Sequence, residues 1–329
     1  MPVGLVKKMR PKVSVIIINW NGKHFLEPCL ESLKRQNFKN FETIIVDNAS
    51  EDGSIEMLGK KFPHVKVIRN TEGLGFPAAC NIGIAALHGK YLVFLNNDTV
   101  ADKRWLDTLV FHADKSSSSV ASFASRLMFL KKPGIVNSTG LRIAKRGRAR
   151  DRDFGKKVAN ASAYSKDIFG ASANGALYRR SSLEKIKEDA GQYMRGEYFI
   201  YYEDVDLAFK LRWKGYSSQY VHNAVVFHHY TGSTCKTPGF SAWKSHINCQ
   251  RTILRNFTLR MILQNLPRIV FADIKEMGYV FLKCSPFAPF KSKIIILTEF
   301  LKWRRWHNEM RKNFRIDEKL VSRYLQDEI

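Results

Sequence analysis

The chain has 329 residues, 45% of them hydrophobic, so it can bury a large core and is not a disordered protein. Its formal net charge of +24 predicts an anionic partner: an anionic membrane, a phosphorylated ligand or nucleic acid. Five dispersed cysteines without a C-x-x-C motif argue against a disulfide or zinc framework and favour a reducing compartment.

Strands and helices are expected to alternate over the first hundred residues. Continuous β-branched or apolar runs predict buried strands, and apolar residues at helical spacing predict the helices between them. In chain order, the expected elements are strand 13–19, helix 25–35, strand 41–46, helix 54–62, strand 65–68, helix 77–87 and strand 91–95. This order predicts an α/β fold built from βαβ units, with a Rossmann-like, mostly parallel central sheet flanked by helices.

Polar side chains occur where three of these strands end. Asn19 ends the first strand, Asp47 follows the second, and Asn96, Asn97 and Asp98 follow the fourth. Ligands of open parallel sheets bind at the carboxyl ends of the strands. We therefore expect these side chains to converge on one edge of the sheet.

A glycine-rich stretch, GLGFPA at 73–78, partly resembles a dinucleotide-binding fingerprint. It follows the third strand, whereas the turn after the first strand reads NWNG. A Rossmann dehydrogenase requires its glycines in that first turn. The stretch is therefore interpreted as a glycine-rich loop that leads into a helix.

The middle of the chain is strongly basic. A polar loop is expected at 116–119, and residues 123–157 contain 11 Lys and Arg against two Asp. Two interpretations are open: an exposed, mobile segment that binds anions, or the solvated face of a folded element. Residues 170–178 predict a loop of small residues that enters a strand.

A second acidic cluster begins the helix expected within residues 197–216, EYFIYYEDVDLAFKLRWKGY. Glu203 and Asp204 could simply cap this helix, or they could line a pocket with the preceding aromatic residues. Further on, an apolar strand at 224–227 runs into His228 and His229, followed by hydroxyl residues at 231, 233 and 234. These histidines are either structural or part of a metal or phosphate site.

Six motifs, in this order and spacing, resemble those of the family 2 glycosyltransferases, and most of all their rhamnosyltransferase-like branch. They are VSVIIINWNG, IIVDNASEDGS, NTEGLGFPAACNIGI, YLVFLNNDT, YYEDVDLAFKLRWKGY and VVFHHYTGST, within residues 11–235. The resemblance implies a GT-A fold with a nucleotide-sugar-binding half at 1–110 and an acceptor-binding, catalytic half at 111–235. A basic, amphipathic helical extension would follow at 236–329.

The resemblance also implies the reaction. A hexosyl group would pass with inversion from a nucleotide-diphosphate sugar to a glycan or a lipid-linked saccharide, as in polysaccharide biosynthesis, with Mg²⁺ or Mn²⁺ as cofactor. Rhamnose from a dTDP donor is the expectation for this branch.

The nucleotide-binding residues follow from the same resemblance. Asp47 matches the acid that reads the base or ribose of the donor, and Asn19 and Asn21 match the loop that lines the nucleotide. Asn96 and Asn97 occupy the first two positions of the family's Asp-x-Asp motif, where Asn96 replaces an acid.

The metal-binding and catalytic residues are carried over in the same way. Asp98 keeps the last carboxylate of the Asp-x-Asp motif, and His228 matches the histidine that completes the metal site, with His229 as the alternative. Asp204 matches the general base, and Glu203 would hold the acceptor or orient that base.

These residue types suit the chemistry. A hard cation can bridge the oxygens of the leaving diphosphate and keep several waters, so one or two protein ligands are enough. The acceptor hydroxyl has a high pKa and needs a base opposite the leaving group, and a single displacement inverts the anomeric configuration. The helix N-terminus should lower the pKa of Asp204, and the charge of Glu203 should raise it.

The last hundred residues lie outside the resemblance. After Cys235, 18 Lys and Arg face eight Asp and Glu, and aromatic residues at 300, 303 and 306 alternate with basic ones. A basic amphipathic helix suits an anionic membrane surface, although the stripe could equally form core against the catalytic domain. Neither a signal peptide nor a membrane-spanning run is predicted, so we expect a cytoplasmic protein, peripheral on the inner face of the cell membrane.

Two other classes of function remain open. Asn96 in place of an acid is compatible with a catalytically silent relative that binds nucleotide sugars or glycans. The net charge alone suggests a nucleic-acid-binding protein, but the chain contains no known nucleic-acid-reading motif. We therefore expect no nucleic acid partner.

Overall fold

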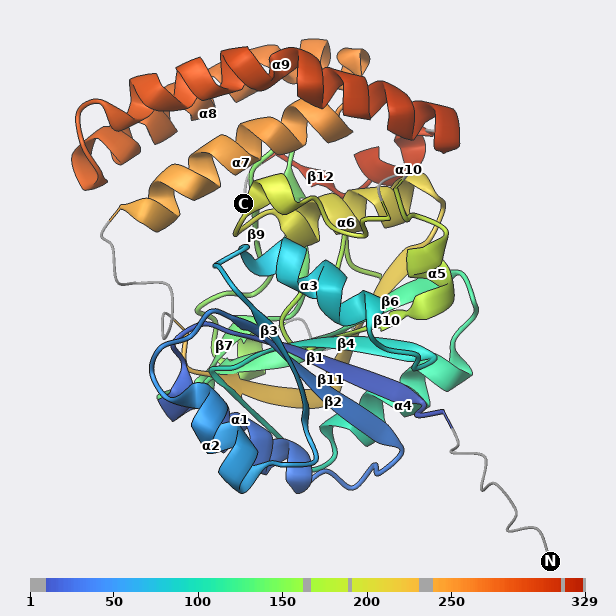
Figure 1. Cartoon of the computed structure of the whole chain (residues 1–329). Helices are drawn as coiled ribbons and strands as arrows, with labels where there is room; N and C mark the ends of the chain where they lie inside the picture. The colour runs from blue at the N-terminus through green and yellow to red at the C-terminus, as the bar shows by residue number, and fades with distance from the viewer. Residues whose placement is uncertain (1–9, 162–166, 189–190, 231–238, 315–316, 328–329) are drawn as a thin grey trace, which may run out of the picture.

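The computed structural model describes residues 10–161, 167–188, 191–230, 239–314 and 317–327. Within this part of the chain, a nine-stranded sheet has the order β3-β2-β1-β4-β10-β6-β11-β5, with β7 paired to β6. Helices cover both faces of the sheet, and further helices of the C-terminal region form an additional layer (Figure 1). The expected α/β fold, with a Rossmann-like central sheet flanked by helices and a C-terminal helical extension, is confirmed.

The first half of the sheet is parallel, as predicted. β1 lies between β2 and β4, and β3 pairs with the outer side of β2. The elements are β1 (Val13–Asn19), α1 (Lys23–Lys34), β2 (Phe41–Asn48), α2 (Ser54–Lys61), β3 (Lys66–Asn70), α3 (Phe76–Ala85) and β4 (Tyr91–Asn96). The register places Asn19 beside Asp47, and Ile18 beside Asn96. The polar strand ends therefore share one edge of the sheet.

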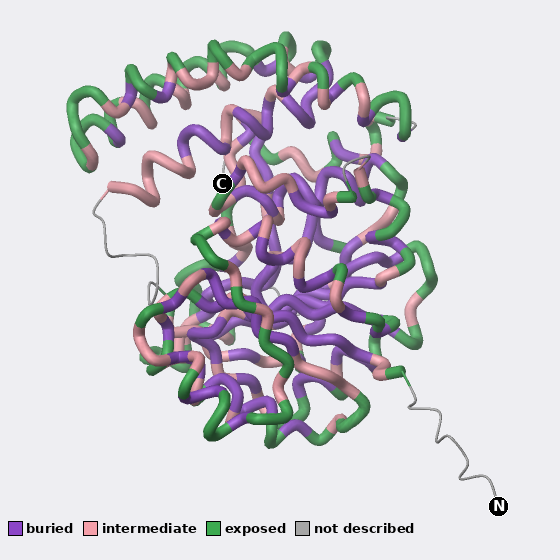
Figure 2. Tube along the Cα trace, viewed as in Figure 1, coloured by how far each residue is buried: buried purple, intermediate pink, exposed green. Residues whose placement is uncertain are grey.

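The β1 strand is buried on both faces. Ile16 belongs to one hydrophobic cluster, whereas Val15 and Ile17 belong to another. Because successive side chains of a strand point to opposite faces, the two clusters lie on the two sides of the sheet. Figure 2 shows the resulting buried centre. A continuous apolar run was therefore a correct signal for a central parallel strand.

The second half of the sheet is mixed. β10 (Ala176–Arg179) is antiparallel to both of its neighbours, β4 and β6 (Val120–Phe129). β11 (Ser217–His228) runs parallel to β6, and its end pairs with β5 (Thr99–Ala101). The strand expected at 224–227 is the last part of β11, which begins seven residues earlier. Pairing of His228 with Thr99 brings the end of β11 to the turn that contains Asp98.

The remaining elements of this half surround the mixed strands. They are α4 (Trp105–Lys115), β7 (Lys132–Ser138), β8 (Leu141–Ala144), β9 (Ala149–Asp151), η1 (Val158–Asn160), α5 (Arg180–Glu184), η2 (Gly196–Tyr198) and α6 (Glu203–Trp213). β8 and β9 form a hairpin, and β12 (Leu325–Gln326), near the end of the chain, extends it.

The interpretation of residues 123–157 as an exposed, mobile segment is wrong. The segment contains most of β6 and all of β7, β8 and β9. Buried apolar side chains such as Phe123, Val136 and Ile143 anchor it, whereas the arginines cluster on the β8–β9 hairpin. The charge count hid these strands because it ignored the apolar residues between the basic ones.

The C-terminal region is helical. It contains α7 (Phe240–Asn256), α8 (Leu259–Lys283), α9 (Ala288–Asn313) and α10 (Glu318–Ser322). α7 contacts α6, and α8 and α9 form the layer beyond α7 at the top of Figure 1. Within the described residues, no helix has the length and apolar composition needed to cross a membrane.

Candidate functional site

Four polar side chains connect the strand ends. Asn97 donates to Asn19 over 2.9 Å, and Asn19 donates to a carboxylate oxygen of Asp47 over 2.9 Å and to the hydroxyl of Ser50 over 3.1 Å. The other oxygen of Asp47 accepts from the backbone N–H of Ser50 over 2.9 Å. Asn19 and Asp47 are fully buried. The predicted convergence is therefore present, and Asp47 holds the loop that follows β2.

Gly22 permits this network. A Cβ atom at this position would lie 2.1 Å from the side-chain nitrogen of Asn97 and 2.9 Å from the oxygen of Asn19. The neighbouring residue Asn21 accepts a hydrogen bond from the N–H of Glu51 over 2.8 Å, which joins the loops after β1 and β2. The NWNG turn thus serves close packing of polar loops.

A hollow of about 390 Å³ adjoins this network at the ends of β2 and β3. It is lined by Ala49, Ser50, Glu51, Arg69, Asn70 and Thr71. The sequence reasoning missed Arg69 and Asn70, although both lie at the end of a predicted strand. The same strand-end rule that singled out Asp47 would have found them.

Asp98 and His228 lie side by side. The Nε2 atom of His228 is 3.1 Å from a carboxylate oxygen of Asp98, and its Nδ1 atom is 2.9 Å from the side-chain oxygen of Asn137. A carbonyl-type partner on one ring nitrogen orients the imidazole and leaves the other nitrogen to face Asp98. His229 instead packs its ring on Phe25 and meets Asp98 only through its backbone.

The donor atoms of Asp98 and His228 fit a divalent cation as a partial ligand set. Among the described residues, no group of three or more His, Cys, Asp or Glu side chains is arranged to hold a metal ion. Mg²⁺ and Mn²⁺ often bind through one or two protein ligands together with waters and substrate phosphates. The pair is compatible with such a cation, which would need a phosphate-bearing ligand to complete its coordination.

Glu203 and Asp204 begin α6, where Glu203 is buried and Asp204 is partly exposed. Burial, and then the charge of Asp204, raises the pKa of Glu203 to about 8. Burial also raises the pKa of Asp204, although hydrogen bonds from the N–H of Ala173 and from Ser172 oppose it. The expected lowering of the Asp204 pKa by the helix N-terminus is therefore outweighed by desolvation, so Asp204 is a stronger base than predicted.

Glu203 keeps its proton near neutral pH, because burial and the charge of Asp204 raise its pKa to about 8. One carboxyl oxygen of Glu203 is buried and meets no hydrogen-bond partner among the described residues. A group of this kind is available to a ligand.

Two consecutive residues join the carboxylate pair to the Asn96–Asp98 turn. The N–H of Ala173 donates to Asp204 over 3.2 Å, and the side-chain oxygen of Asn174 accepts from the N–H of Asn96 over 3.3 Å. Neighbouring Cα atoms are about 3.8 Å apart, so the two clusters belong to one site. Asn96 itself reaches the site through its backbone.

Asp151 is a further carboxylate of this site that the sequence reasoning missed. Burial, and then the charge of Asp204, raises the pKa of Asp151 to about 6, while His228 opposes the shift. Asp151 is therefore within electrostatic reach of both the carboxylate pair and the Asp98–His228 pair. It was hidden among the basic residues of the β8–β9 hairpin, and only the antiparallel pairing of that hairpin brings it here.

The loop before Glu203 has an unusual backbone. Phe199, Tyr201 and Tyr202 have positive φ angles of 64°, 66° and 71°. Such conformations are costly for bulky residues and are concentrated at functional sites. Asn248 of α7 stabilises this loop by donating from its side-chain nitrogen to the carbonyl oxygens of Tyr198, Ile200 and Tyr201, at 2.8–2.9 Å.

The glycine-rich stretch before α3 also supports this loop. Gly75 has a φ of 80°, and a Cβ atom there would lie 2.5 Å from the carbonyl oxygen of Phe199. That oxygen accepts from the N–H of Phe76 over 2.8 Å. The interpretation of GLGFPA as a loop leading into a helix is therefore confirmed.

The hydroxyl residues at 231, 233 and 234 lie outside the described residues.

Solved structures with the same fold bind nucleotide sugars. The mannosyltransferase PcManGT from Pyrobaculum calidifontis, in complex with GDP-Man and Mn²⁺, aligns with a TM-score of 0.52 and 16% identity over 98% of this chain and 89% of that one. S. aureus TarS 1–349 in complex with UDP-GlcNAc has a TM-score of 0.52 and 16% identity, over 94% and 82% of the chains. At these identities the similarity establishes the GT-A fold alone.

Curated relatives are glycosyltransferases by name. The chain is 26% identical over 221 residues to the putative glycosyltransferase EpsH of Bacillus subtilis, covering 64% of this chain and 58% of that protein. It is 29% identical over 133 residues to an uncharacterized glycosyltransferase of Haemophilus influenzae, covering 39% and 41%. The chain thus spans less than two thirds of the length of these relatives.

The family model described as glycosyl transferase family 2 matches residues 14–187, more than half of the chain. The match includes both polar strand ends, the Asn96–Asp98 turn and the Ala173–Asn174 bridge. The rhamnosyltransferase-like branch has no corresponding support. The chain belongs to glycosyl transferase family 2.

Proposed function

We propose that this protein is an inverting glycosyltransferase that moves a hexosyl group from a nucleotide-diphosphate donor to a hydroxyl of a glycan or a lipid-linked saccharide. The observation that carries the proposal is the bridge of Ala173 and Asn174 between Asp204 and the Asn96–Asp98 turn. It brings a base of raised pKa next to a turn suited to hold a diphosphate. Such a site has the two parts that sugar transfer requires.

Asp204 is the proposed general base. It accepts the proton of the acceptor hydroxyl as the oxygen attacks the anomeric carbon, while the bond from that carbon to the diphosphate oxygen breaks. Glu203, protonated near neutral pH, donates a hydrogen bond that orients the acceptor. Asp151 interacts electrostatically with Asp204 and His228, and we propose that it adds a third carboxyl group to the acceptor side of the site. A single displacement inverts the anomeric configuration.

Asp98 and His228 are the proposed protein ligands of Mg²⁺ or Mn²⁺. The support is their 3.1 Å contact and the orientation of the imidazole by Asn137. When bound, the cation supplies positive charge next to the departing diphosphate. Asn137 and the backbone of His229 keep both side chains in place.

The nucleotide is proposed to bind at the ends of β1, β2 and β3. Asn19, Asn97 and Asp47 shape this edge, and the hollow beside Ser50 and Arg69 provides room for the base and ribose. Asn21 holds the two loops together. We propose dTDP-rhamnose as the donor, and UDP and GDP sugars are the alternative donors to be tested against it.

The proposed location is the inner face of the cell membrane, where the protein would act as a peripheral enzyme of polysaccharide biosynthesis. Support comes from the net charge of +24 and the basic C-terminal region. We further propose that residues 1–110 bind the donor, that residues 111–235 bind the acceptor and carry the catalytic residues, and that residues 236–329 form the helical extension.

The test is release of nucleoside diphosphate from a panel of dTDP, UDP and GDP sugars, with Mg²⁺, Mn²⁺ or EDTA. We expect release from one donor, dependent on the cation and lost in Asp98→Ala and Asp204→Asn. Asp107→Asn, on the exposed side of α4, is the matched control and should remain active. General-base removal should lower the rate by about 10²–10⁴-fold.

Donor binding is measured in parallel by calorimetry. Tight, cation-dependent binding of a donor, with no release of nucleoside diphosphate in the presence of any acceptor tested, would identify a catalytically silent relative that binds nucleotide sugars. If the protein binds none of the donors in the panel, the glycosyltransferase proposal is overturned.

A further inference from the structure

Two stripes of exposed apolar side chains run along the outer faces of α8 and α9. On each helix the residues are three or four positions apart, the spacing that places side chains on one face. The α9 stripe, with exposed fractions of 63–79%, consists of Phe287, Phe290, Ile294, Leu297 and Leu301. The α8 stripe, with exposed fractions of 44–63%, consists of Leu259, Leu263, Leu266, Val270 and Ile274.

The inner faces of the same helices already form the contacts that the fold needs. Trp303 and His307 are fully buried, and α9 packs on α7. The expected aromatic stripe is therefore partly core, whereas the outer apolar stripes are additional to it. Figure 2 shows this division between buried and exposed sides along both helices.

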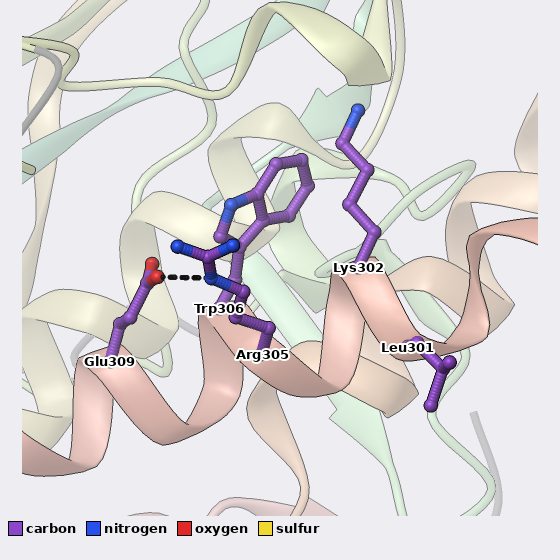
Figure 3. A pocket seen from close by; sticks show the side chains of 5 residues that line it. All are labelled: Leu301, Lys302, Arg305, Trp306 and Glu309. Atoms are coloured by element: carbon purple, nitrogen blue, oxygen red, sulfur yellow. Dashed lines mark hydrogen bonds and ion pairs between the residues drawn. The ribbon is translucent and has the colours of Figure 1, made fainter.

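A close view of α9 shows the two sides. Leu301 points away from the side to which Lys302 and Trp306 point (Figure 3). Trp306 stacks under the guanidinium of Arg195, 3.9 Å from the ring centre, so that side faces the body of the protein. The shallow hollow on this part of α9, about 540 Å³, is lined by Leu301 of the stripe as well as by Lys302 and Trp306, and by none of the proposed catalytic residues.

The exposed charges around the stripes are basic. α8 and α9 together contain four acidic residues, none of them fully exposed, and each forms an ion pair. These pairs are Asp273 with Lys293, Glu276 with Arg148, Glu299 with Arg251, and Glu309 with Arg305. Exposed lysines at 275, 283 and 291 lie close to the stripes and to the α8–α9 turn. The outer face thus combines apolar stripes with positive charge.

We infer that the outer face of α8 and α9 is a docking surface for an anionic lipid bilayer. A basic amphipathic helix lies in the plane of the membrane interface, with its apolar side among the acyl chains and its cations near the anionic headgroups. Phe287 and Phe290, near the α8–α9 turn, suit the apolar side of such a surface. A second copy of the chain fits less well, because a symmetric contact would bring the same lysines together.

The docking surface is connected to the catalytic loop. Arg148 of the β8–β9 hairpin pairs with Glu276 of α8, and the N–H of Ala149 donates to the hydroxyl of Tyr202 over 3.2 Å. Tyr202 directly precedes Glu203. The helix that carries one of the two stripes is therefore linked, through the β8–β9 hairpin, to the loop that precedes Glu203. This refines the proposed peripheral location and does not depend on the transfer chemistry.

The test is flotation of the full chain with vesicles of phosphatidylcholine, with and without phosphatidylglycerol, at low and high salt. We expect binding to the anionic vesicles that weakens with salt. Leu297→Glu should lower partitioning by roughly tenfold or more, because a large apolar side chain no longer enters the interface. Phe111→Glu, at an exposed position of α4, is the matched control and should bind like the unmodified protein.

Three results would overturn the inference. The first is no binding to anionic vesicles, and the second is an equal effect of the two substitutions. The third is an unmodified protein that is dimeric without lipid in sedimentation velocity, with Leu297→Glu monomeric. Donor binding separates this surface from the proposed function, because a protein that binds vesicles but no donor would support the former and contradict the latter.

Discussion

The side-chain nitrogen of Asn248 lies 2.9 Å from the carbonyl oxygen of Tyr201, two residues before the carboxylate pair. The same nitrogen also donates to the carbonyls of Tyr198 and Ile200. Asn248 belongs to α7, outside the part of the chain with family motifs. The C-terminal region therefore contributes to the geometry of the proposed catalytic loop as well as covering it.

Asn248→Ala is expected to misplace Asp204. Three backbone carbonyls, of which that of Tyr198 is buried, would lose their donor, and the strained loop would be free to relax. A buried group left unsatisfied costs about 1–3 kcal/mol. We expect transfer to slow by roughly tenfold or more and its pH profile to shift, because the environment of the carboxylates changes. Rates across pH and thermal unfolding are measured, with exposed Asn308→Ala on α9 as the control. Lower stability with an unchanged pH profile would assign Asn248 a purely structural role.

Glu203→Gln is expected to change how stability depends on pH. Burial and the charge of Asp204 raise the pKa of Glu203 from 4.5 to about 8. The folded protein therefore keeps a proton that the unfolded chain releases, so this residue makes stability fall as pH rises from about 4.5 to about 8. Glutamine cannot ionise and removes this loss.

The expected gain of Glu203→Gln is on the order of a few kcal/mol at pH 8 and disappears near pH 4. Urea unfolding at both pH values measures it, with exposed Glu72→Gln as the control. A difference between variant and unmodified protein that is the same at both pH values would show that Glu203 titrates normally.

His228→Ala and His229→Ala distinguish two adjacent histidines. Only His228 has a ring nitrogen near Asp98, whereas the ring of His229 lies on Phe25. We expect His228→Ala to weaken cation-dependent donor binding by at least about tenfold, as for loss of a residue that holds or orients a metal. His229→Ala should retain most of this binding. Calorimetric titration of the donor with Mn²⁺ compares them, and a larger loss in His229→Ala would reverse the assignment.

Arg255→Met is expected to destabilise the fold. Arg255 is buried and pairs at 2.7 Å with both Asp206 and Glu188, which link α7 to α6 and to the segment before η2. Removal of one partner from a buried ion pair leaves uncompensated charge and typically costs about 3–5 kcal/mol.

Arg305→Met is the control for this substitution. Arg305 forms an exposed pair with Glu309, so its loss should cost at most about 1 kcal/mol. Both free energies of unfolding come from denaturant titration. Equal costs would show that the buried network adds little to the docking of α7.

Local patterns predicted the first, parallel half of the sheet well and the second, mixed half poorly. The buried run 13–19 and the alternation after it correctly predicted parallel strands, because a parallel sheet has short-range βαβ connections. β10 was expected as a strand, but its antiparallel position between β4 and β6 was not. That position joins segments about 50 and 80 residues apart, and no local pattern specifies such pairing.

The sequence by itself determined the family, through the resemblance of its motifs to known ones. It also determined the polar strand ends and the carboxylates at the start of α6, since these follow from residue type and spacing. Only the tertiary structure decided that Asp151 and Asn248 belong to the same site, because they arrive from a hairpin and a distant helix. It also reversed the expected pKa of Asp204, since burial depends on what packs around the helix end. On α9 the sequence showed an amphipathic pattern, but only packing against α7 revealed which apolar side remains exposed.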